Sequence, residues 1–227
     1  MDVYSFDAYK NGNSKKAFAY EEIKQKIINN ELKPGQVLNE RDLCDILNVS
    51  RTPIREALLK LSNDGLVSIM QNRGALVSNI TYEMITEIYD VRWALESLAA
   101  RLFCEYALDE EVKNLGDTLE NLKRSKESSD MEEFVKEDRK FHNIIIEGAR
   151  NKKLINIMGG INSQVERITN LTKKDEKRSE TTLIHHENLF SQIQQRNKEE
   201  AEKFMKYHIA ESKEYHLRNL NHLLARL

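Results

Sequence analysis

Residues that interrupt helices are scarce in this chain. Of its 227 residues, only two are proline and eight are glycine, and strict alternation of apolar and polar residues is rare. Proline and glycine are the least favourable residues inside helices, and alternation is typical of half-buried strands. The sequence therefore predicts a mainly α-helical protein, and its length suits two modest domains.

Charge and cysteine content exclude several classes of protein. Charged residues make up 32% of the chain, but the formal net charge is only −2, so we expect no overall basic coat, while a local basic face stays compatible. Cys44 and Cys104 form no CxxC pair, which argues against a disulfide framework or zinc ribbon. Met1 to Asn13 lacks the apolar core of a signal peptide, and no apolar run is long enough for a membrane span. We expect a cytoplasmic protein.

The N-terminal third follows the pattern of a winged helix-turn-helix domain. We expect a flexible tail over residues 1–14 and the domain over residues 15–79, with three helices and a β-hairpin wing. The first helix is predicted for residues 15–30, while Asn39 and Ser50 are expected to cap the second and third helices. Gly65 is expected to end the third helix. Strands are predicted at residues 66–70 and 75–78, with a very short one at 37–38.

The remainder of the chain predicts a second, all-helical domain over residues 80–227. Apolar residues recur there at helical spacing, and short polar breaks divide the pattern into about six segments. The predicted helices are 82–107, 109–127, 131–149, 152–172, 176–196 and 198–225. We expect them to form a helical bundle.

The third predicted helix carries donors suited to a DNA groove. Arg51 and Arg55 are four residues apart and therefore share one face of that helix. Arginine can contact guanine with two hydrogen bonds in the major groove, where the second helix of a helix-turn-helix lies. Arg41, at the start of the preceding helix, is placed for a phosphate or base, and the turn with Asn72 and Gly74 for the minor groove or backbone. The alternative is that these are ordinary solvated side chains.

The same segment resembles a known family. Leu32-Lys33-Pro34-Gly35 and the run Val49-Ser50-Arg51-Thr52-Pro53-Ile54-Arg55-Glu56-Ala57-Leu58 are similar to the GntR family of winged-helix regulators, over residues 15–79. The resemblance implies that Arg41, Arg51, Arg55 and Gly74 contact DNA, with Ser50, Thr52 and Asn72 as lesser candidates. Ten basic residues against eight acidic ones give the module only about +2. We therefore expect a homodimer to present two modules to a palindromic operator, with salt-sensitive binding.

All six histidines lie in the second half of the chain. Asp138 and His142 are four residues apart on one predicted helix, so both can face one cavity, and His186 and His208 lie on two later helices. One carboxylate and three imidazoles suit zinc, nickel, manganese or another divalent transition metal. The alternative is that these are surface or satisfied core histidines, and we place His185, His216 and His222 in that class.

A second resemblance supports the metal hypothesis. Asp138-Arg139-Lys140-Phe141-His142, His186 and Met205-Lys206-Tyr207-His208-Ile209 look like motifs of the C-terminal domain of the FadR branch of GntR regulators, the FCD domain, over residues 82–222. Members with this Asp and three His bind a divalent metal beneath a small organic acid. The resemblance implies that role for Asp138, His142, His186 and His208. His185 is a departure, because the family often has an acid there, which weakens expected support for the ligand.

Arg92 is the candidate for holding the carboxylate of an effector, because a guanidinium matches that group with two hydrogen bonds. The alternative is a salt bridge with Glu96, four residues on. A nearby apolar stripe is expected to be domain core or dimer interface rather than ligand pocket. Its members are Trp93, Leu95, Leu98 and Leu102.

Three functions fit these features. The first is a DNA-binding transcriptional regulator, a repressor that responds to a small carboxylic acid bound at the metal, and this is the prediction. The second is a metalloenzyme that activates water, but no Glu-x-x-His or HExxH motif or phosphate-binding loop is present, and the N-terminal module would be unexplained. The third is an architectural DNA-binding protein with a structural metal, whose affinity for DNA ignores every small molecule.

Overall fold

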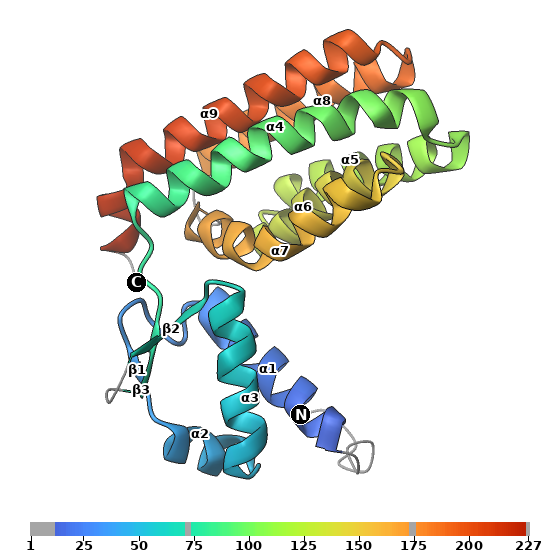
Figure 1. Cartoon of the computed structure of the whole chain (residues 1–227). Coiled ribbons are helices and arrows are strands. Elements are labelled where there is room, and N and C mark those ends of the chain that lie inside the picture. The colour runs from blue at the N-terminus through green and yellow to red at the C-terminus, as the bar shows by residue number, and fades with distance from the viewer. Residues whose placement is uncertain (1–11, 71–73, 173–175, 226–227) are drawn as a thin grey trace. The chain divides into compact units, whose positions relative to one another are not determined.

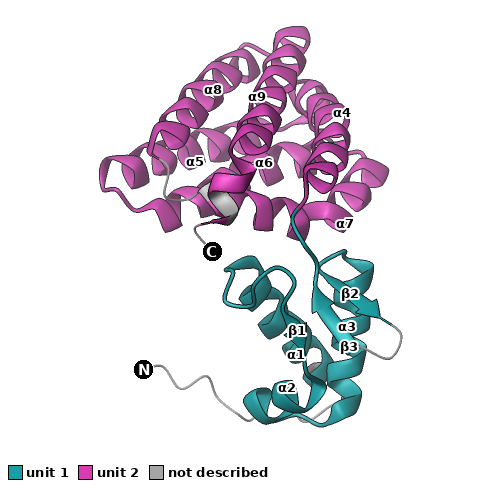
Figure 2. Ribbon diagram, turned by 90° about the vertical axis from the view of Figure 1, so that its left-hand side faces the viewer, with its two compact units in different colours: residues 1–80, 227 teal, residues 81–226 magenta. Residues whose placement is uncertain are grey.

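The computed structural model describes residues 12–70, 74–172 and 176–225. Two compact units divide the chain (Figure 2), one formed by the described residues up to Ile80 and the other beginning at Thr81. Among the described residues, no helix has both the length and the apolar character that a bilayer crossing requires. The expected mainly helical architecture is confirmed.

The N-terminal unit combines three helices with a small antiparallel sheet in the strand order β1-β3-β2. Helices α1 and α3 pack against each other over a core that includes Ile23, Ile27, Ile54 and Leu61. The hairpin pairs Val67 with Val77 and Met70 with Gly74. The elements are α1 (Gly12–Ile28), β1 (Val37–Leu38), α2 (Glu40–Leu47), α3 (Arg51–Asn63), β2 (Val67–Met70) and β3 (Gly74–Val77).

Local signals explain most boundaries in this unit. The Asn39 side chain accepts a hydrogen bond from the Arg41 amide at 2.9 Å and so caps α2. Asn48 takes the left-handed conformation that ends this helix, with φ of 51°, and Gly65 follows α3 with φ of 72°. Ser50 occupies the expected cap position of α3, but its side chain makes no capping hydrogen bond, so its predicted capping interaction is wrong.

The first helix begins earlier than the sequence predicts. Gly12, Asn13 and Ser14 were expected to end the flexible tail, but they lie in the first turn of α1. Small polar residues tolerate a helix start, where the first amides need no intrahelical acceptor. The predicted tail over residues 1–11 and the predicted wing residue Asn72 lie outside the described residues.

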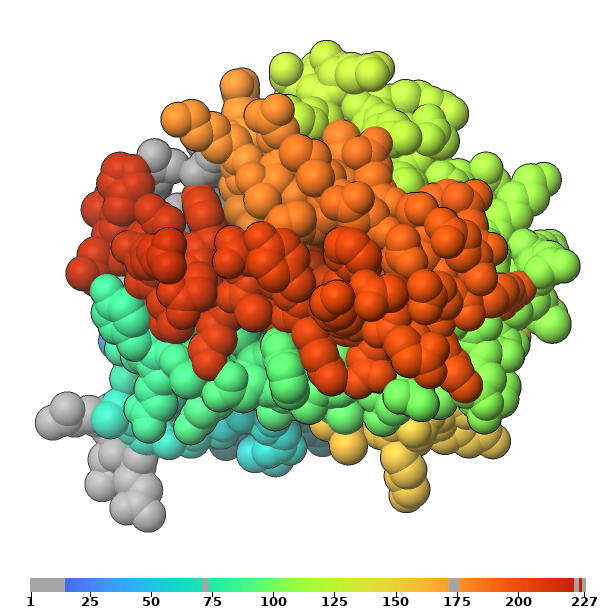
Figure 3. All heavy atoms as spheres, turned by 90° about the horizontal axis from the view of Figure 1, so that it is seen from above, coloured from blue at the N-terminus to red at the C-terminus, as the bar shows by residue number. Residues whose placement is uncertain are grey.

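The C-terminal unit is a helical bundle in which α4 packs along α9 (Figure 1). Helix α9 lies between α4 and α8 on the face seen in Figure 3, and α5 packs against α6 and α8. Thr81 caps α4 and Asp130 caps α6 through their side-chain oxygens. The elements are α4 (Tyr82–Tyr106), α5 (Asp109–Glu127), α6 (Met131–Gly148), α7 (Lys152–Thr169), the 3-10 helix η2 (Asn170–Thr172), α8 (Glu176–Gln194) and α9 (Lys198–Leu224).

Helix α4 turns a polar face into the bundle. Tyr89, Arg92 and Glu96 are buried, whereas Trp93 and Leu98 are 43% and 38% exposed. The predicted apolar stripe is therefore not domain core at Trp93 and Leu98, while Leu95 and Leu102 are half-buried. The sequence could not reveal this, because apolar residues occur on both sides of α4 and the burial of Arg92 and Glu96 depends on their partners. The other expectation for this stripe, a dimer interface, stays a prediction.

Candidate functional sites

The first candidate site is the exposed face of α3. Arg51, Thr52 and Arg55 are exposed there, while Ile54 and Leu58 are buried against the rest of the unit. The helix is amphipathic because its apolar residues recur at positions 54, 57, 58 and 61. Its basic side chains are thus presented to solvent, as a helix that enters a DNA groove requires.

The neighbouring predicted contacts are also at the surface. Ser50, Arg41 and Gly74 are exposed. Arg55 Nε lies 2.8 Å from a carboxylate oxygen of Glu40 on α2. This pair is solvent-exposed and worth at most about 1 kcal/mol, so Arg55 can exchange Glu40 for another acceptor at little cost.

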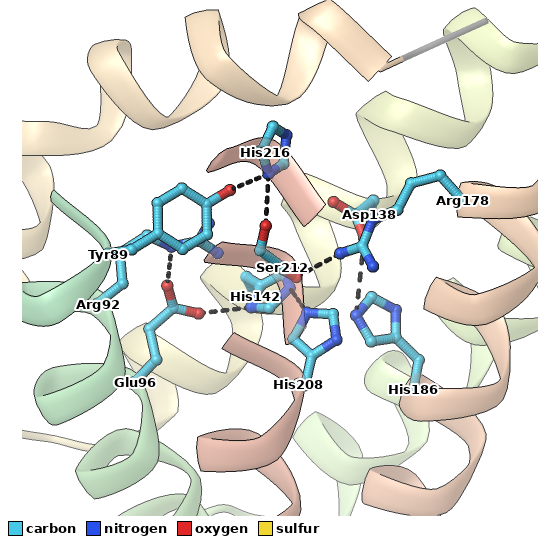
Figure 4. Close-up of polar contacts among 10 residues, drawn as sticks. All are labelled: Tyr89, Arg92, Glu96, Asp138, His142, Arg178, His186, His208, Ser212 and His216. Atoms are coloured by element: carbon cyan, nitrogen blue, oxygen red, sulfur yellow. Dashed lines mark hydrogen bonds and ion pairs between the residues drawn. The ribbon is translucent and has the colours of Figure 1, made fainter. Parts of the chain in front are cut away.

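The second candidate site is a cluster of three buried histidines inside the C-terminal unit (Figure 4). His142 comes from α6, His186 from α8 and His208 from α9, and one ring nitrogen of each lies within 4.8 Å of the others. The Nε2 atoms of His142 and His208 are 3.2 Å apart. Asp138, one turn before His142, places Oδ1 3.6 Å from His186 Nε2.

Several polar atoms of this cluster have no hydrogen-bond partner among the described residues. They are Asp138 Oδ1 and both ring nitrogens of His186. A buried polar atom without a partner costs about 1–3 kcal/mol, and three such atoms beside two further imidazoles need an explanation. Three imidazole nitrogens and one carboxylate oxygen form a donor set that suits a divalent transition metal, so the residues present fit such an ion.

Burial controls the charge of these groups. Burial lowers the pKa of His186 and of His208 well below the ordinary value, and the neighbouring histidines and Arg178 lower both further. Both rings are therefore neutral, which is the form that binds a metal. Burial also raises the pKa of Asp138, against the opposing effect of His142, Arg92 and Arg178.

A carboxylate fixes the orientation of His142. Glu96 Oε2 lies 2.5 Å from His142 Nδ1, and Glu96 Oε1 accepts from Arg92 Nε at 2.6 Å. Burial raises the pKa of Glu96, but the charges and hydrogen bonds of Arg92 and His142 outweigh burial and lower the pKa to about 2. The ionised Glu96 accepts the Nδ1 proton of His142, so Nε2 presents its lone pair to the cluster.

The cluster forms one wall of a small cavity. Its volume is about 50 Å³ for the centres of water-sized molecules, above the roughly 10–15 Å³ that one water requires. Polar groups from α4, α6, α8 and α9 line it. They include Tyr89, Arg92, Asp138, His142, Arg178, Ser179, Thr182, His208, Ser212 and His216.

Comparison with known families assigns both halves of the chain. The model of bacterial regulatory proteins of the gntR family matches residues 15–77, and that of the FCD domain matches residues 87–211. The chain belongs to the GntR family of transcriptional regulators and carries an FCD domain. Members of this family regulate transcription and are not enzymes, so the metalloenzyme alternative has no support.

Individual relatives agree with this assignment. The regulator is 31% identical over 206 residues to the HTH-type transcriptional regulator YdhC of Bacillus subtilis, covering 90% of each chain. It is 26% identical to the HTH-type transcriptional repressor RspR of Escherichia coli, covering 86% of each. Its fold is similar to the crystal structure of a GntR regulator from Rhodococcus sp. RHA1, with a TM-score of 0.75, 21% identity and coverage of 89% and 97%.

The structure of the regulator brings together the four predicted metal ligands, Asp138, His142, His186 and His208. Arg92 is paired with Glu96, as the salt-bridge alternative predicts, and it also lines the cavity. Its role in holding an effector carboxylate stays a prediction.

Sequence reasoning missed other parts of this pocket. His216 was classed as an ordinary structural histidine, yet it is buried and lines the cavity. His185, placed in the same class, has Nδ1 3.4 Å from His208 Nδ1. Tyr89 and Arg178 were not singled out at all. One signal was available in the sequence, since His208, Ser212 and His216 recur every four residues and thus share a face of α9.

Proposed function

We propose that this regulator is a cytoplasmic, homodimeric repressor whose FCD domain holds a divalent transition metal and senses a small organic acid there. The observation that carries the proposal is the convergence of three buried imidazoles with the unpartnered oxygen of Asp138. RspR, a relative over most of the chain, is named a repressor. Zinc, nickel and manganese are the candidate ions, because mixed imidazole and carboxylate sites accept each of them.

The proposed ligands of the ion are Asp138, His142, His186 and His208. Glu96 holds His142 with its Nε2 lone pair toward the cluster, as carboxylates commonly do for metal-bound imidazoles. A bound ion would supply a Lewis acid to which an oxygen of the effector can coordinate.

Arg92 is proposed to bind the effector carboxylate. Arg92 donates its hydrogen bond to Glu96 through Nε. Its two terminal nitrogens make no hydrogen bond to any residue that the structure describes. Those nitrogens are the pair that a carboxylate engages in a bidentate contact. Arg92 also lines the cavity beside Asp138 and His142.

The DNA contacts are proposed to come from α2, α3 and the wing. Arg51 and Arg55 would reach base edges and phosphates, and Arg55 would exchange its contact with Glu40 for DNA. The other proposed contacts are Arg41, Ser50, Thr52, Asn72 and Gly74. Two copies would bind the halves of a palindromic operator.

Binding of the acid is proposed to change operator affinity through the connection between the units. Residues 78–81 join the hairpin to α4, and α4 carries Arg92 and Glu96. The effect requires that the acid binds one state of the protein more tightly than the other. An architectural DNA-binding protein would lack this response.

The test uses full-length protein and an operator selected from a random pool of duplex DNA. Metal analysis should give about one ion per chain for the native protein and none for Asp138→Asn, whereas Asp117→Asn, at an exposed position of α5, should keep the ion. A panel of small carboxylic acids should then weaken operator binding only by the metal-loaded protein. Equal metal content in both variants, or operator affinity that no acid changes, would refute the proposal.

A further inference from the structure

Helices α8 and α9 carry a second polar layer beside the histidine cluster. Thr182 lies one turn before His186 on α8, and Ser212 lies one turn after His208 on α9. Four residues of α-helix span about 6 Å. Both Thr182 and Ser212 line the cavity, so a molecule held at the proposed metal site meets this layer about one helical turn away.

Arg178 supplies the charge of this layer. It shares a face of α8 with Thr182 and His186, because the three residues recur every four positions. Its Nη2 atom donates a hydrogen bond to the Ser212 hydroxyl, so the guanidinium reaches across to α9 (Figure 4). Arg178 is half-buried and lines the cavity. A positive charge therefore lies at the cavity wall.

The hydroxyl of Thr182 adds a hydrogen-bond donor to this layer. Ser179 and Thr181 bond carbonyl oxygens of their own helix, but Thr182 makes no hydrogen bond to any residue that the structure describes. Thr182 is 6% exposed, yet its oxygen is not among the fully enclosed polar atoms that lack a partner. Because Thr182 lines the cavity, its hydroxyl is available to a molecule bound there.

The charges around the cavity favour a ligand with two negative groups. Arg92 and Arg178 both line the cavity, and Asp138 is the one acid among its described lining residues. Glu96 balances Arg92 through their hydrogen bond, and Asp138 would balance only half the charge of a divalent ion. Positive charge therefore exceeds negative charge once the proposed ion is bound, and a dianion balances this wall better than a monoanion does.

We propose that Arg178 and Thr182 bind the second carboxylate of a short dicarboxylic acid, whose first carboxylate is held by the metal and Arg92. A guanidinium and a hydroxyl both donate hydrogen bonds, and an ionised carboxylate only accepts them. Hydrogen bonds between such charged groups are also the strong ones. This inference deepens the proposed function and rests on it, because that function assigns the first carboxylate.

The spacing of the two layers limits the length of the acid. The carboxyl carbons of succinate are three bonds apart, as consecutive Cα atoms are, which corresponds to about 3.8 Å in an extended chain. The carboxylate oxygens extend this span toward the separation of about 6 Å between the layers, and glutarate has one carbon more. A neutral polar group is the competing occupant, because hydroxyl groups such as that of Thr182 can bond it without charge, and the experiment includes it.

The experiment compares two diacids with their monoamides by calorimetry on zinc-loaded full-length protein. The ligands are succinate, succinamate, glutarate and glutaramate, since an amide has nearly the shape of a carboxylate but no charge. At least one diacid should bind tenfold or more tightly than its monoamide, because hydrogen bonds between charged groups are roughly twice as strong as neutral ones. A preference below tenfold in both pairs would overturn the inference without any variant.

Three variants assign the preference for the second carboxylate to the charge of Arg178. Arg178→Gln removes the charge but keeps an amide that can donate a hydrogen bond, and it should reduce the preference to less than threefold. Arg178→Lys keeps the charge and should keep most of the preference. Lys177→Gln, which removes a charge from the neighbouring exposed position of α8, should also keep it. A preference that survives in Arg178→Gln, or that is lost in either of the other two variants, contradicts the assignment.

Thr182→Val tests the second member of the subsite. It should weaken succinate binding about tenfold, because it deletes one hydrogen bond to a charged group, and unchanged affinity would contradict the proposal. Zinc content should be native in every variant, since none of the replaced residues is a proposed ligand of the ion. If no acid binds zinc-loaded protein, the proposed function has failed and this inference with it. If acids bind without a preference for the second carboxylate, only this inference has failed.

Discussion

Replacing Glu96 by glutamine removes the charge that links Arg92 to the proposed metal site. Glu96 is 1% exposed and accepts hydrogen bonds from both Arg92 and His142. Glutamine has the same shape, but its amide group would turn a donor toward one of these two donors. The substitution thus isolates the charge and its hydrogen bonds from the packing of α4.

The size of the effect follows from the pKa of Glu96. The pKa is about 2 against an ordinary value of 4.5, because Arg92 and His142 outweigh the opposing effect of burial. At about 1.4 kcal/mol per pH unit, the ionised form stabilises the fold by about 3 kcal/mol. A carboxyl with a lowered folded pKa contributes this stability above pH 4.5 and loses it as the pH falls toward 2.

The assay is urea unfolding of metal-free protein at pH 7, followed by zinc competition against a chelator. Glu96→Gln should lower the free energy of unfolding by about 3 kcal/mol and weaken zinc binding by about 10–100-fold, since His142 loses its carboxylate support. Glu87→Gln, at an exposed position of the same helix, should change neither. Native stability and native zinc affinity in Glu96→Gln would refute the electrostatic reasoning.

Three other substitutions probe separate parts of the molecule. Arg51→Ala should weaken operator binding by about 1–3 kcal/mol in gel-shift titrations and leave urea unfolding unchanged, because Arg51 is exposed. Gly148→Ala should lower the free energy of unfolding by about 1–3 kcal/mol, since its new Cβ would lie 2.4 Å from Phe103 in the core; unfolding at the native urea concentration would contradict this. The contribution of His216 to the free energy of unfolding should fall by about 2 kcal/mol between pH 8 and pH 5, because its folded pKa of about 3 lies below its ordinary 6.5. The free energy of unfolding of His216→Asn should therefore fall by correspondingly less over that range.

The helices were predictable because their signals are local. Polar breaks and caps such as Asp130 and Asn151 act within one turn, and they define helix ends without reference to the rest of the fold. The start of α1 was less predictable, since the polar residues before Lys15 are compatible with both a tail and a first turn.

The sites were predictable to different degrees for a physical reason. Asp138 and His142 share one face of α6 by spacing alone, but the approach of His186 and His208 depends on how three helices pack. The sequence left the two roles of Arg92 open, and the structure permits both, because one guanidinium can bond Glu96 through Nε and an anion through its other nitrogens. The spacing of His208 and His216 places both on one face of α9, but the burial of His216 beside Tyr89 depends on how α4 and α9 pack.

Helix α4 connects the proposed ligand site to the proposed response of the DNA-binding unit. Tyr89, Arg92 and Glu96 lie on its inner face, so an acid that engages the proposed metal site and Arg92 touches this helix. Helix α4 begins at Tyr82, directly after the connection to the hairpin. A contact between the acid and Arg92 that favours one position of α4 by a factor of ten contributes about 1.4 kcal/mol to the change in operator affinity. Arg92→Lys, which cannot make the bidentate contact with a carboxylate, would therefore respond less to the acid even at concentrations that saturate the metal site. Operator titrations of both proteins at saturating acid would measure this, and an equal response would contradict the role of Arg92.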